Sequence, residues 1–224
     1  MIRKIEENTV SAQAQTANPV KITKNGGKIR ILFIGNSITR HAPKAELSWY
    51  NDCGMAASAE EKDYVHVTIK LLEERYGAID YAVANCAAWE RAYYDDTLLQ
   101  NWSAARDFNA DIVVIRLGEN LWSARDKFDE QPIEKHFANM VEYFSPNPFA
   151  KVVVSGLFWA QPTIENVLYS VAKDKGYAFV ALDDLGENEE NTATKKFPHA
   201  GVAMHPGDLG MERIARRIAK TILQ

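Results

Sequence analysis

The sequence predicts an α/β protein: a three-layer α/β/α sandwich around a doubly wound, mainly parallel, five-stranded sheet. Two observations predict this fold. Five apolar runs of strand length recur along the chain, and helical patterns separate them. The runs are continuous rather than alternating, which is typical of strands covered on both faces. Because a crossover helix must lie on a face of the sheet, alternating strands and helices give three layers.

The expected strands are residues 29–35 (IRILFIG), 79–85 (IDYAVAN), 111–117 (DIVVIRL), 151–157 (KVVVSGL) and 177–183 (YAFVALD). Apolar residues three and four apart predict the helices between and after them. These helices cover Val65 to Tyr76, Ile133 to Phe144, Pro162 to the residue before Gly176, and Met211 to Ile222. Gly77 and Gly176 are stop signals, and Pro132 and Pro162 are start signals.

The chain divides into a short arm and one domain. Residues 1–29 are polar with Gly26 and Gly27 near their end, which indicates a peripheral arm or hairpin. Residues 30–224 form the expected catalytic domain, and a chain of 224 residues is long enough for one sizeable core. A long polar connection runs from Asp183 to Pro206, and connections of that length are usually functional or mobile.

Composition excludes several classes of partner. A formal charge of −4 without a basic stripe argues against nucleic acid. No apolar run is long enough to cross a membrane, and the first 29 residues lack the apolar core of a secretory signal. The chain as given is therefore expected in the cytoplasm, whereas a trimmed chain would fit a secreted or periplasmic protein. Cys53 and Cys86 lack metal-ligand spacing and are interpreted as reduced thiols.

Three polar residues follow expected strands at positions where such sheets bind ligands. Ser37 ends the stretch GNS after the first strand, Asn120 ends GEN after the third strand, and His205 opens HPGD before the last helix. Asn36 and Ser37 could instead simply turn the chain and cap a helix. Because the first and third strands are commonly neighbours in a doubly wound sheet, we expect Ser37 and Asn120 to approach each other, with His205 reaching them from the closing loop.

These residue types suit acyl transfer. A serine hydroxyl becomes a useful nucleophile when a neutral imidazole removes its proton. The tetrahedral intermediate then carries an oxyanion that fixed N–H donors stabilise. We interpret Ser37 as the nucleophile, His205 as the base, and the Asn120 side chain and the Ser37 backbone N–H as oxyanion donors.

The motifs GNSI, GEN and HPGD, in this order, resemble those of the SGNH (GDSL-like) hydrolases. The resemblance covers about residues 30–224 and implies a flavodoxin-like doubly wound sandwich. It also implies a serine esterase or acylhydrolase that acts without metal or cofactor. Carried over by position, Ser37 is the nucleophile, Asn120 an oxyanion donor and His205 the base.

The sequence departs from the family pattern at two positions. The family usually has a glycine oxyanion donor after its second strand, where this chain reads NCAAWERAYY. A backbone N–H from the segment Ala88 to Glu90 can replace it, and we take Glu90 as the equivalent position. The family also commonly has an aspartate three residues before its histidine, where this chain has Val202. We expect a backbone carbonyl near Val202 to orient the imidazole. Asp208 is the alternative acid, although an N-cap role for the last helix explains it without catalysis.

Other polar and aromatic residues have structural interpretations beside the functional ones. Asp183 and Asp184 are remoter candidate acids or turn residues. A structural ion pair between Glu90 and Arg116 is as reasonable as substrate binding. The histidines His41, His66, His136 and His199 show no metal-binding pattern. Trp102 is expected in the core, and Trp49, Trp89, Trp122 and Trp159 either line a pocket mouth or pack.

The sequence thus predicts a serine esterase that hydrolyses a small acyl ester, most simply an acetyl group on a sugar, through a Ser37 acyl-enzyme. Its expected partner is a small-molecule or carbohydrate ester, with no nucleic acid and no membrane. Three alternatives remain: an acyltransferase or phospholipase-like enzyme with the same site, a non-catalytic carbohydrate-binding protein on the same scaffold, and a flavodoxin-like binding or signalling module.

Overall fold

A single sheet organises the chain in the computed structural model, which describes residues 19–224. The sheet has six strands in the order β1-β3-β2-β4-β5-β6. Their bounds are β1 Val20–Thr23, β2 Ile29–Gly35, β3 Ile79–Asn85, β4 Ile112–Arg116, β5 Lys151–Ser155 and β6 Ala178–Val180. Strands β2 to β6 pair in parallel, and β1 alone pairs antiparallel, with β3. The predicted doubly wound, mainly parallel sheet is therefore confirmed.

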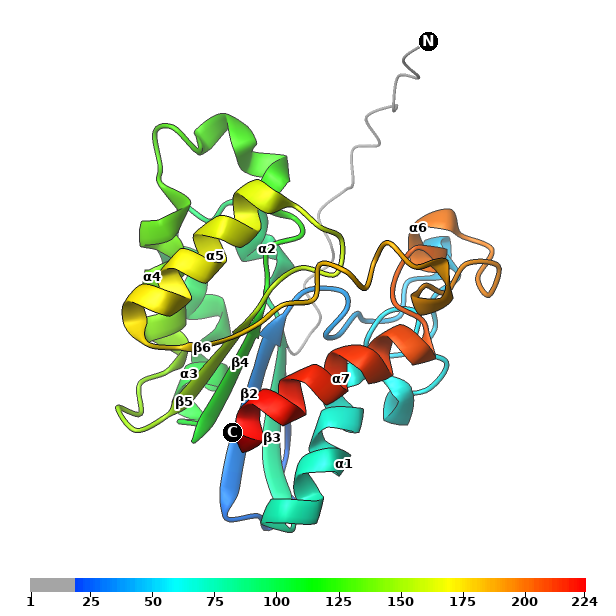
Figure 1. Ribbon diagram of the computed structural model, residues 1–224, viewed down its shortest axis with the longest axis horizontal. Coiled ribbons are helices and arrows are strands. Elements are labelled where there is room, and N and C mark those ends of the chain that lie inside the picture. The colour runs from blue at the N-terminus through cyan, green and yellow to red at the C-terminus, as the bar shows by residue number, and fades with distance from the viewer. Residues whose placement is uncertain (1–18) are drawn as a thin grey trace.

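Helices cover both faces of this sheet. The α-helices are α1 Tyr64–Tyr76, α2 Ala87–Arg91, α3 Ser103–Asp107, α4 Ile133–Phe144, α5 Pro162–Lys175, α6 Ala200–Ala203 and α7 Asp208–Leu223. Short 3₁₀ turns are η1 Ala45–Leu47, η2 Glu60–Lys62, η3 Asp96–Trp102, η4 Leu121–Lys127 and η5 Glu189–Asn191. Helices α1 and α7 lie together on one face, and α3, α4 and α5 lie on the other (Figure 1). None of the helices between residues 19 and 224 has the length and apolarity needed to cross a membrane.

The central strand β2 shows why its sequence is apolar throughout. Ile31 and Phe33 pack into the core beneath α1 and α7, whereas Leu32 and Ile34 pack into the core beneath α4 and α5. All four side chains are fully buried. Since successive side chains of a strand point to opposite faces, a strand with two covered faces needs apolar residues at every position.

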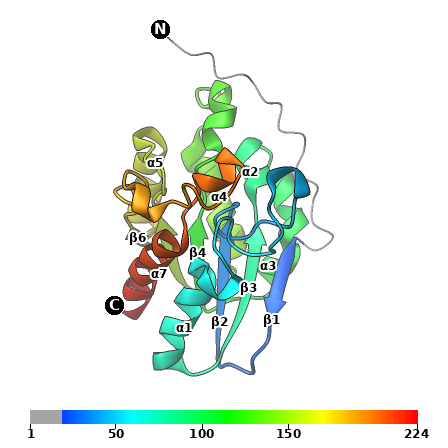
Figure 2. The same ribbon diagram turned by 90° about the vertical axis from the view of Figure 1, so that its right-hand side faces the viewer.

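The arm contributes a strand that the sequence analysis did not predict. Residues Val20 to Thr23 pair with Tyr81 to Ala84, so the sheet has six strands and not the expected five. Figure 2 shows β1 along the outer edge of β3. An unpaired strand edge leaves backbone N–H and C=O groups without partners, and β1 satisfies those of β3. Residues 1–18 of the expected arm lie outside the described residues.

The last parallel strand is shorter than expected, because β6 covers Ala178–Val180 rather than residues 177–183. The chain then turns away from the sheet and runs through η5 and α6 before α7 begins. This connection passes over the carboxyl ends of the strands (Figure 1). It therefore delivers His205 to the edge of the sheet where the chain leaves β2.

Candidate active site

The loop after β2 presents Ser37 at the carboxyl edge of the sheet. The backbone N–H groups of Thr39 and Arg40 both donate to the Asn36 carbonyl at 3.0 Å, which closes a tight turn around the serine. The Met55 N–H donates to the Ser37 carbonyl at 2.9 Å. Asn36 is buried, whereas Ser37 is partly exposed. The turn thus fixes the serine backbone and leaves its hydroxyl facing outward.

Ser37 and His205 meet although 168 positions separate them in the sequence. Ser37 Oγ lies 2.8 Å from His205 Nε2. His205 Nδ1 lies 2.7 Å from the carbonyl oxygen of Gly201, in the short helix α6. A carbonyl oxygen can only accept, so the imidazole carries its proton on Nδ1 and offers the lone pair of Nε2 to the serine O–H. The acceptor is the residue before Val202, close to the position expected from the sequence.

The surroundings of His205 favour the neutral ring. Burial lowers the pKa of His205 to about 4, the Gly201 hydrogen bond opposes this shift, and the nearby charges of His41 and Arg116 add to it. The Trp159 ring stands edge-on against the imidazole with 5.2 Å between the ring centres, which keeps water from that side. At neutral pH the imidazole is therefore unprotonated and able to accept a proton.

The candidate acids from the sequence are engaged elsewhere. Asp208 is the first residue of α7 and the N-cap is Gly207, so the expected N-cap role of Asp208 is wrong. Its carboxylate accepts from the backbone N–H of Ser58 at 2.8 Å and from the Ser58 hydroxyl at 2.7 Å. Asp184 pairs with both terminal nitrogens of Arg217. Each of these carboxylates therefore fastens a surface loop to α7.

Glu90 enters the site through its side chain. Its backbone N–H donates to the Cys86 carbonyl at 3.4 Å within α2, while its carboxylate is completely buried. Oε1 accepts from the Gly118 N–H at 2.6 Å, from Asn36 Nδ2 at 3.2 Å and from the Asn120 N–H at 3.3 Å. Oε2 accepts from Asn120 Nδ2. One carboxylate thus ties the loop after β2 to the loop after β4.

A second buried carboxylate, Glu119, continues this arrangement. It pairs with Arg116, and its Oε2 accepts from Asn36 Nδ2 at 2.6 Å. Arg116 is fully buried and also donates to Asn36 Oδ1 at 3.1 Å. The expected Glu90–Arg116 ion pair is therefore wrong: Arg116, the last residue of β4, pairs with Glu119 in the loop that follows, and Glu90 is satisfied by N–H donors instead. We call Asn36, Glu90, Arg116, Glu119 and Asn120 the buried polar cluster.

The charges of this cluster do not cancel, since two carboxylates face one guanidinium. Burial raises the pKa of Glu90, and the Glu119 carboxylate adds to the rise. Hydrogen bonds from Asn120, Gly118 and Asn36 act in the opposite direction because they stabilise the ionised form. A carboxylate is stable in such a buried site only when its oxygens accept enough hydrogen bonds, as the carboxylate oxygens of Glu90 and Glu119 do here.

Asn120, the predicted oxyanion donor, lies in the loop after β4, the strand adjacent to β2. β2 and β4 are neighbours, with Gly35 opposite Arg116, so the two following loops leave the sheet side by side. The Asn120 carboxamide has two N–H bonds, and the contact with Glu90 uses one of them. Arg91 Nη2 donates to its oxygen at 3.3 Å, which fixes the amide so that the nitrogen faces Glu90.

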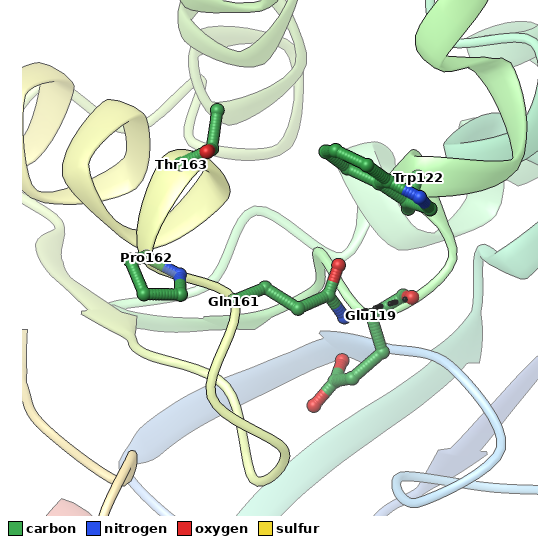
Figure 3. A pocket seen from close by; sticks show the side chains of 5 residues that line it. All are labelled: Glu119, Trp122, Gln161, Pro162 and Thr163. Atoms are coloured by element: carbon green, nitrogen blue, oxygen red, sulfur yellow. Dashed lines mark hydrogen bonds between the residues drawn. The ribbon is translucent and has the colours of Figure 1, made fainter. Parts of the chain in front are cut away.

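A hollow opens beside this cluster, lined by Glu119, Trp122, Gln161, Pro162 and Thr163, with a volume of about 420 Å³ (Figure 3). We call it the Trp122 pocket. One side is formed by the loop after β4 and the start of η4, and the other by Gln161 and the first residues of α5. Trp122 is 49% exposed, whereas Trp49 and Trp89 are fully buried, so the latter two do not line a pocket mouth. Trp102 is in the core, as predicted.

The remaining histidines and the cysteines have structural surroundings. His66 pairs with Asp63, and His136 with Asp96. Within residues 19–224, no group of three or more histidine, cysteine or acidic residues is arranged to hold a metal ion. Cys53 and Cys86 are buried free thiols, as interpreted from the sequence. Burial raises the pKa of both thiols, which keeps them protonated and unreactive.

Sequence reasoning missed several contributors to this site. It treated Asn36 only as a turn residue, although the side chain bonds to Glu90, Glu119 and Arg116. It did not single out Gly201, whose carbonyl faces His205, or Gln161, which lines the pocket. A polar residue directly before the serine at the end of a buried strand was the available signal for Asn36. A backbone carbonyl leaves no signal in a sequence.

Comparisons with known proteins agree on the fold. No protein-family model and no curated protein matches the sequence. Among solved structures, a protein of Parabacteroides merdae described as a GDSL-like lipase superposes with a TM-score of 0.56 at 18% identity, covering 88% of this chain and 97% of its own. The acetyl xylan esterase AlAXEase gives 0.54 at 18% identity, with 87% and 100% covered.

A third structure, a family two carbohydrate esterase from Clostridium thermocellum, gives a TM-score of 0.53 at 15% identity, covering 88% of this chain and 63% of that one. At such low identities these likenesses establish the fold and not the reaction. The chain shares the α/β/α sandwich of these solved structures, which is the fold that the resemblance of its motifs predicted.

Proposed function

We propose that this protein is a serine esterase of the SGNH type that removes a small acyl group, most simply acetyl, from a carbohydrate ester. The observation that carries the proposal is the chain of contacts from Ser37 Oγ to His205 Nε2 and from His205 Nδ1 to the Gly201 carbonyl. A serine, a neutral imidazole and an acceptor behind the imidazole are the parts that nucleophilic acyl transfer requires.

In the first half of the reaction, Ser37 Oγ forms a bond to the ester carbonyl carbon while its proton passes to His205 Nε2. The carbonyl oxygen becomes an oxyanion, which the Ser37 backbone N–H and the Asn120 carboxamide stabilise. The tetrahedral intermediate then breaks the bond to the alcohol oxygen, and the imidazolium returns its proton to that oxygen. The alcohol leaves, and the acyl group stays on Ser37.

In the second half, His205 Nε2 takes a proton from water as the water oxygen attacks the acyl carbon. Collapse of the second intermediate releases the carboxylic acid and returns the proton to Ser37 Oγ. During both halves the Gly201 carbonyl accepts from Nδ1–H and stabilises the imidazolium. A carbonyl dipole stabilises the imidazolium less strongly than the carboxylate of a serine triad does. In this protein the imidazole is also held in position between the Gly201 carbonyl and the Trp159 ring.

The choice of a small acyl group and a sugar rests on the shape of the site and on the structural neighbours. The Trp122 pocket combines an aromatic ring with amide and hydroxyl groups. Structural neighbours include an acetyl xylan esterase and a carbohydrate esterase. Apolar walls with a few placed polar groups are the usual composition of a ligand site.

The test is the turnover of p-nitrophenyl acetate by Ser37→Ala. We expect activity to fall by about 10⁴-fold or more, because removing the nucleophile of such a site typically has effects of that order. The control is Ser145→Ala: Ser145 bonds to the Val141 carbonyl at the end of α4, away from the site, and its loss should leave turnover unchanged. Equal turnover in Ser37→Ala and wild type would refute the assignment.

Two further readouts separate the alternatives. A fluorophosphonate should label Ser37 in the wild type, whereas a carbohydrate-binding protein without an activated serine would not react. The missing carboxylate behind His205 is the feature that favours the binding protein. Adding alcohols during turnover detects an acyltransferase, because transfer forms a new ester instead of free acid.

A further inference from the structure

We propose that the Trp122 pocket binds the sugar ring of the ester's alcohol part, with the Trp122 ring as its apolar wall and Gln161 as its hydrogen-bonding residue. The inference rests on the proposed function and adds a specificity site to it. Both segments that line the pocket also contain a residue of the candidate active site or a neighbour of it. Asn120 lies between the lining residues Glu119 and Trp122 in the sequence. Trp159, which packs on His205, precedes the lining residue Gln161 by two positions.

The Trp122 ring is held in place from two sides. The Phe128 ring stands edge-on to it with 6.0 Å between centres, and the Arg125 guanidinium lies 6.0 Å from its centre. The Arg125 side chain also donates to the Trp122 carbonyl at 3.3 Å. A tryptophan that is 49% exposed yet fixed by its neighbours offers a rigid apolar surface. The C–H face of a pyranose packs well on such a surface, because the face of an aromatic ring is electron-rich.

Gln161 supplies a hydrogen-bond acceptor that the described chain leaves unused. Gln161 Nε2 donates to the Glu119 carbonyl at 3.2 Å, which turns the amide so that Oε1 points away from Glu119. Oε1 is buried and has no hydrogen-bond partner among residues 19–224. Figure 3 shows Oε1 directed upward from the chain toward the space between Thr163 and Trp122. A buried amide oxygen without a donor is unfavourable, and a sugar hydroxyl would satisfy it.

The pocket suits an uncharged ligand better than an anion or a fatty chain. Among residues 19–224, the only charged side chain in its lining is that of Glu119, which turns its carboxylate away from Trp122 in Figure 3 and pairs with Arg116. None of the described lining residues is cationic, and the nearby Arg125 lies over the Trp122 ring outside this lining. An acyl chain would cover Gln161 Oε1 without giving it a donor. Several hydroxyl groups on a ring with an apolar face match both Gln161 and Trp122.

The pocket also has a size and a place that suit this role. Its volume of about 420 Å³ lies within the range of small-ligand sites. Its two loops are held to each other, because Gln161 bonds to the Glu119 carbonyl and the Phe158 N–H donates to Glu119 Oε1 at 3.2 Å. The lining residues Glu119 and Trp122 flank Asn120 in the sequence, so the pocket is built partly on the same segment as the candidate oxyanion donor.

The first experiment measures binding without catalysis. Xylotetraose, cellotetraose and maltotetraose are titrated calorimetrically into full-length protein carrying Ser37→Ala, alone and combined with Trp122→Ala or Gln161→Leu. We expect at least one of the three sugars to bind, and each added substitution to weaken that binding by about tenfold, the effect of one lost polar or aromatic contact. Phe149→Ala is the matched control, because Phe149 is a 92% exposed aromatic residue outside the pocket lining.

The second experiment measures specificity in the active protein. Trp122→Ala should lower the ratio of kcat/KM for acetylated xylotetraose to kcat/KM for p-nitrophenyl acetate by about tenfold, mainly through KM. Phe149→Ala should leave this ratio as in the wild type. A parallel series of p-nitrophenyl esters from acetate to octanoate asks whether the pocket holds the acyl chain instead.

The outcomes separate this inference from the proposed function. Sugar binding that depends on Trp122 in a protein with no serine-dependent turnover would support the pocket and refute the esterase. Serine-dependent turnover with an unchanged specificity ratio in Trp122→Ala would refute the pocket alone. Absence of binding to all three sugars, or a loss in Trp122→Ala confined to the longer acyl esters, would also overturn the inference.

Discussion

Two hydrogen bonds join Glu90 to Asn120. The Glu90 carboxylate accepts from the Asn120 backbone N–H at 3.3 Å and from the Asn120 side-chain Nδ2. Glu90 is completely buried, so its carboxylate cannot draw on water for these donors. The residue that we expect to bind the oxyanion is therefore positioned by a carboxylate 30 residues earlier in the chain. Any displacement of Glu90 moves both Asn120 and the loop that carries Ser37, through Asn36.

This relationship predicts the effect of Glu90→Gln. A glutamine keeps the shape but replaces one acceptor oxygen with an NH₂ group, which must face the N–H donors of Gly118 or Asn120. Loss of donor alignment should lower kcat by about 10- to 100-fold and change KM little, because the oxyanion forms only in the transition state. Steady-state kinetics with p-nitrophenyl acetate, expressed per folded molecule, checks this.

The Glu90→Gln experiment needs a variant that separates positioning from stability. Glu142→Gln removes a carboxylate that pairs with Lys175 on the surface, and it should affect neither kcat nor KM. If Glu90→Gln lowered the free energy of unfolding but left kcat unchanged in the folded fraction, Glu90 would be a structural residue only.

The pH profile should reflect the lowered pKa of His205. Because the pKa of His205 is lowered to about 4, the ring stays neutral well below its ordinary pKa. The serine can lose its proton only to a neutral ring, so kcat/KM for the free enzyme should fall as the pH drops through about 4 rather than 6.5. An acid limb near 6.5 would contradict this lowered pKa.

The same pKa shift affects stability with a defined sign. Between about pH 4 and 6.5 the histidine is protonated in the unfolded chain but not in the folded one. The contribution of His205 to stability is therefore complete above pH 6.5 and is lost as the pH falls toward 4. Replacing Trp159 by leucine should hydrate the ring and move the acid limb of kcat/KM upward, which links the profile to this contact.

Gly118→Ala should destabilise the protein and impair the site together. Gly118 has φ +145°, and an added Cβ would lie 2.6 Å from Leu157 Cδ2. Backbone strain and overpacking predict a loss of about 2 to 4 kcal/mol in the free energy of unfolding, measured by urea denaturation. Turnover should also fall, because the Gly118 N–H bonds to Glu90.

Gly77→Ala is the comparison for this variant. Gly77 has φ +70°, and a Cβ there meets no atom within 4 Å. It ends α1 just before β3 begins, and because β3 runs parallel to β2, it lies at the opposite end of the sheet from Ser37, which follows β2. We therefore expect Gly77→Ala to lower stability without lowering turnover per folded molecule. Equal effects of both substitutions on turnover would show that strain alone explains the Gly118 result.

Asp208→Asn tests whether the imidazole depends on a carboxylate. Since Asp208 binds Ser58 and the Gly201 carbonyl faces His205, turnover should stay within about twofold of the wild type. Stability should change by about 1 kcal/mol or less, as is usual for a surface contact. A fall of about 10⁴-fold, the effect of losing the acid of a serine triad, would show that Asp208 acts on His205 after all.

Much of the fold could be predicted from the chain itself. The continuous apolar runs at β2, β4 and β5 predicted the strands, and the three-four spacing in α1, α4, α5 and α7 predicted the long helices. The edge strand Val20–Thr23 was missed because four residues in a polar segment give too short a pattern. Its pairing depends on the open edge of β3, which is not visible in its own sequence.

The sequence by itself indicated the parallel strands, their two covered faces and the positions of Ser37, Asn120 and His205 after or before particular elements, because apolar runs and helical periodicity are encoded locally along the chain. Only the tertiary structure decided that Gly201 faces His205, that Arg116 pairs with Glu119 rather than Glu90, and that Trp122 rather than Trp49 lines a pocket. These contacts depend on directions and distances of ångströms between distant segments, and residue types alone do not specify them.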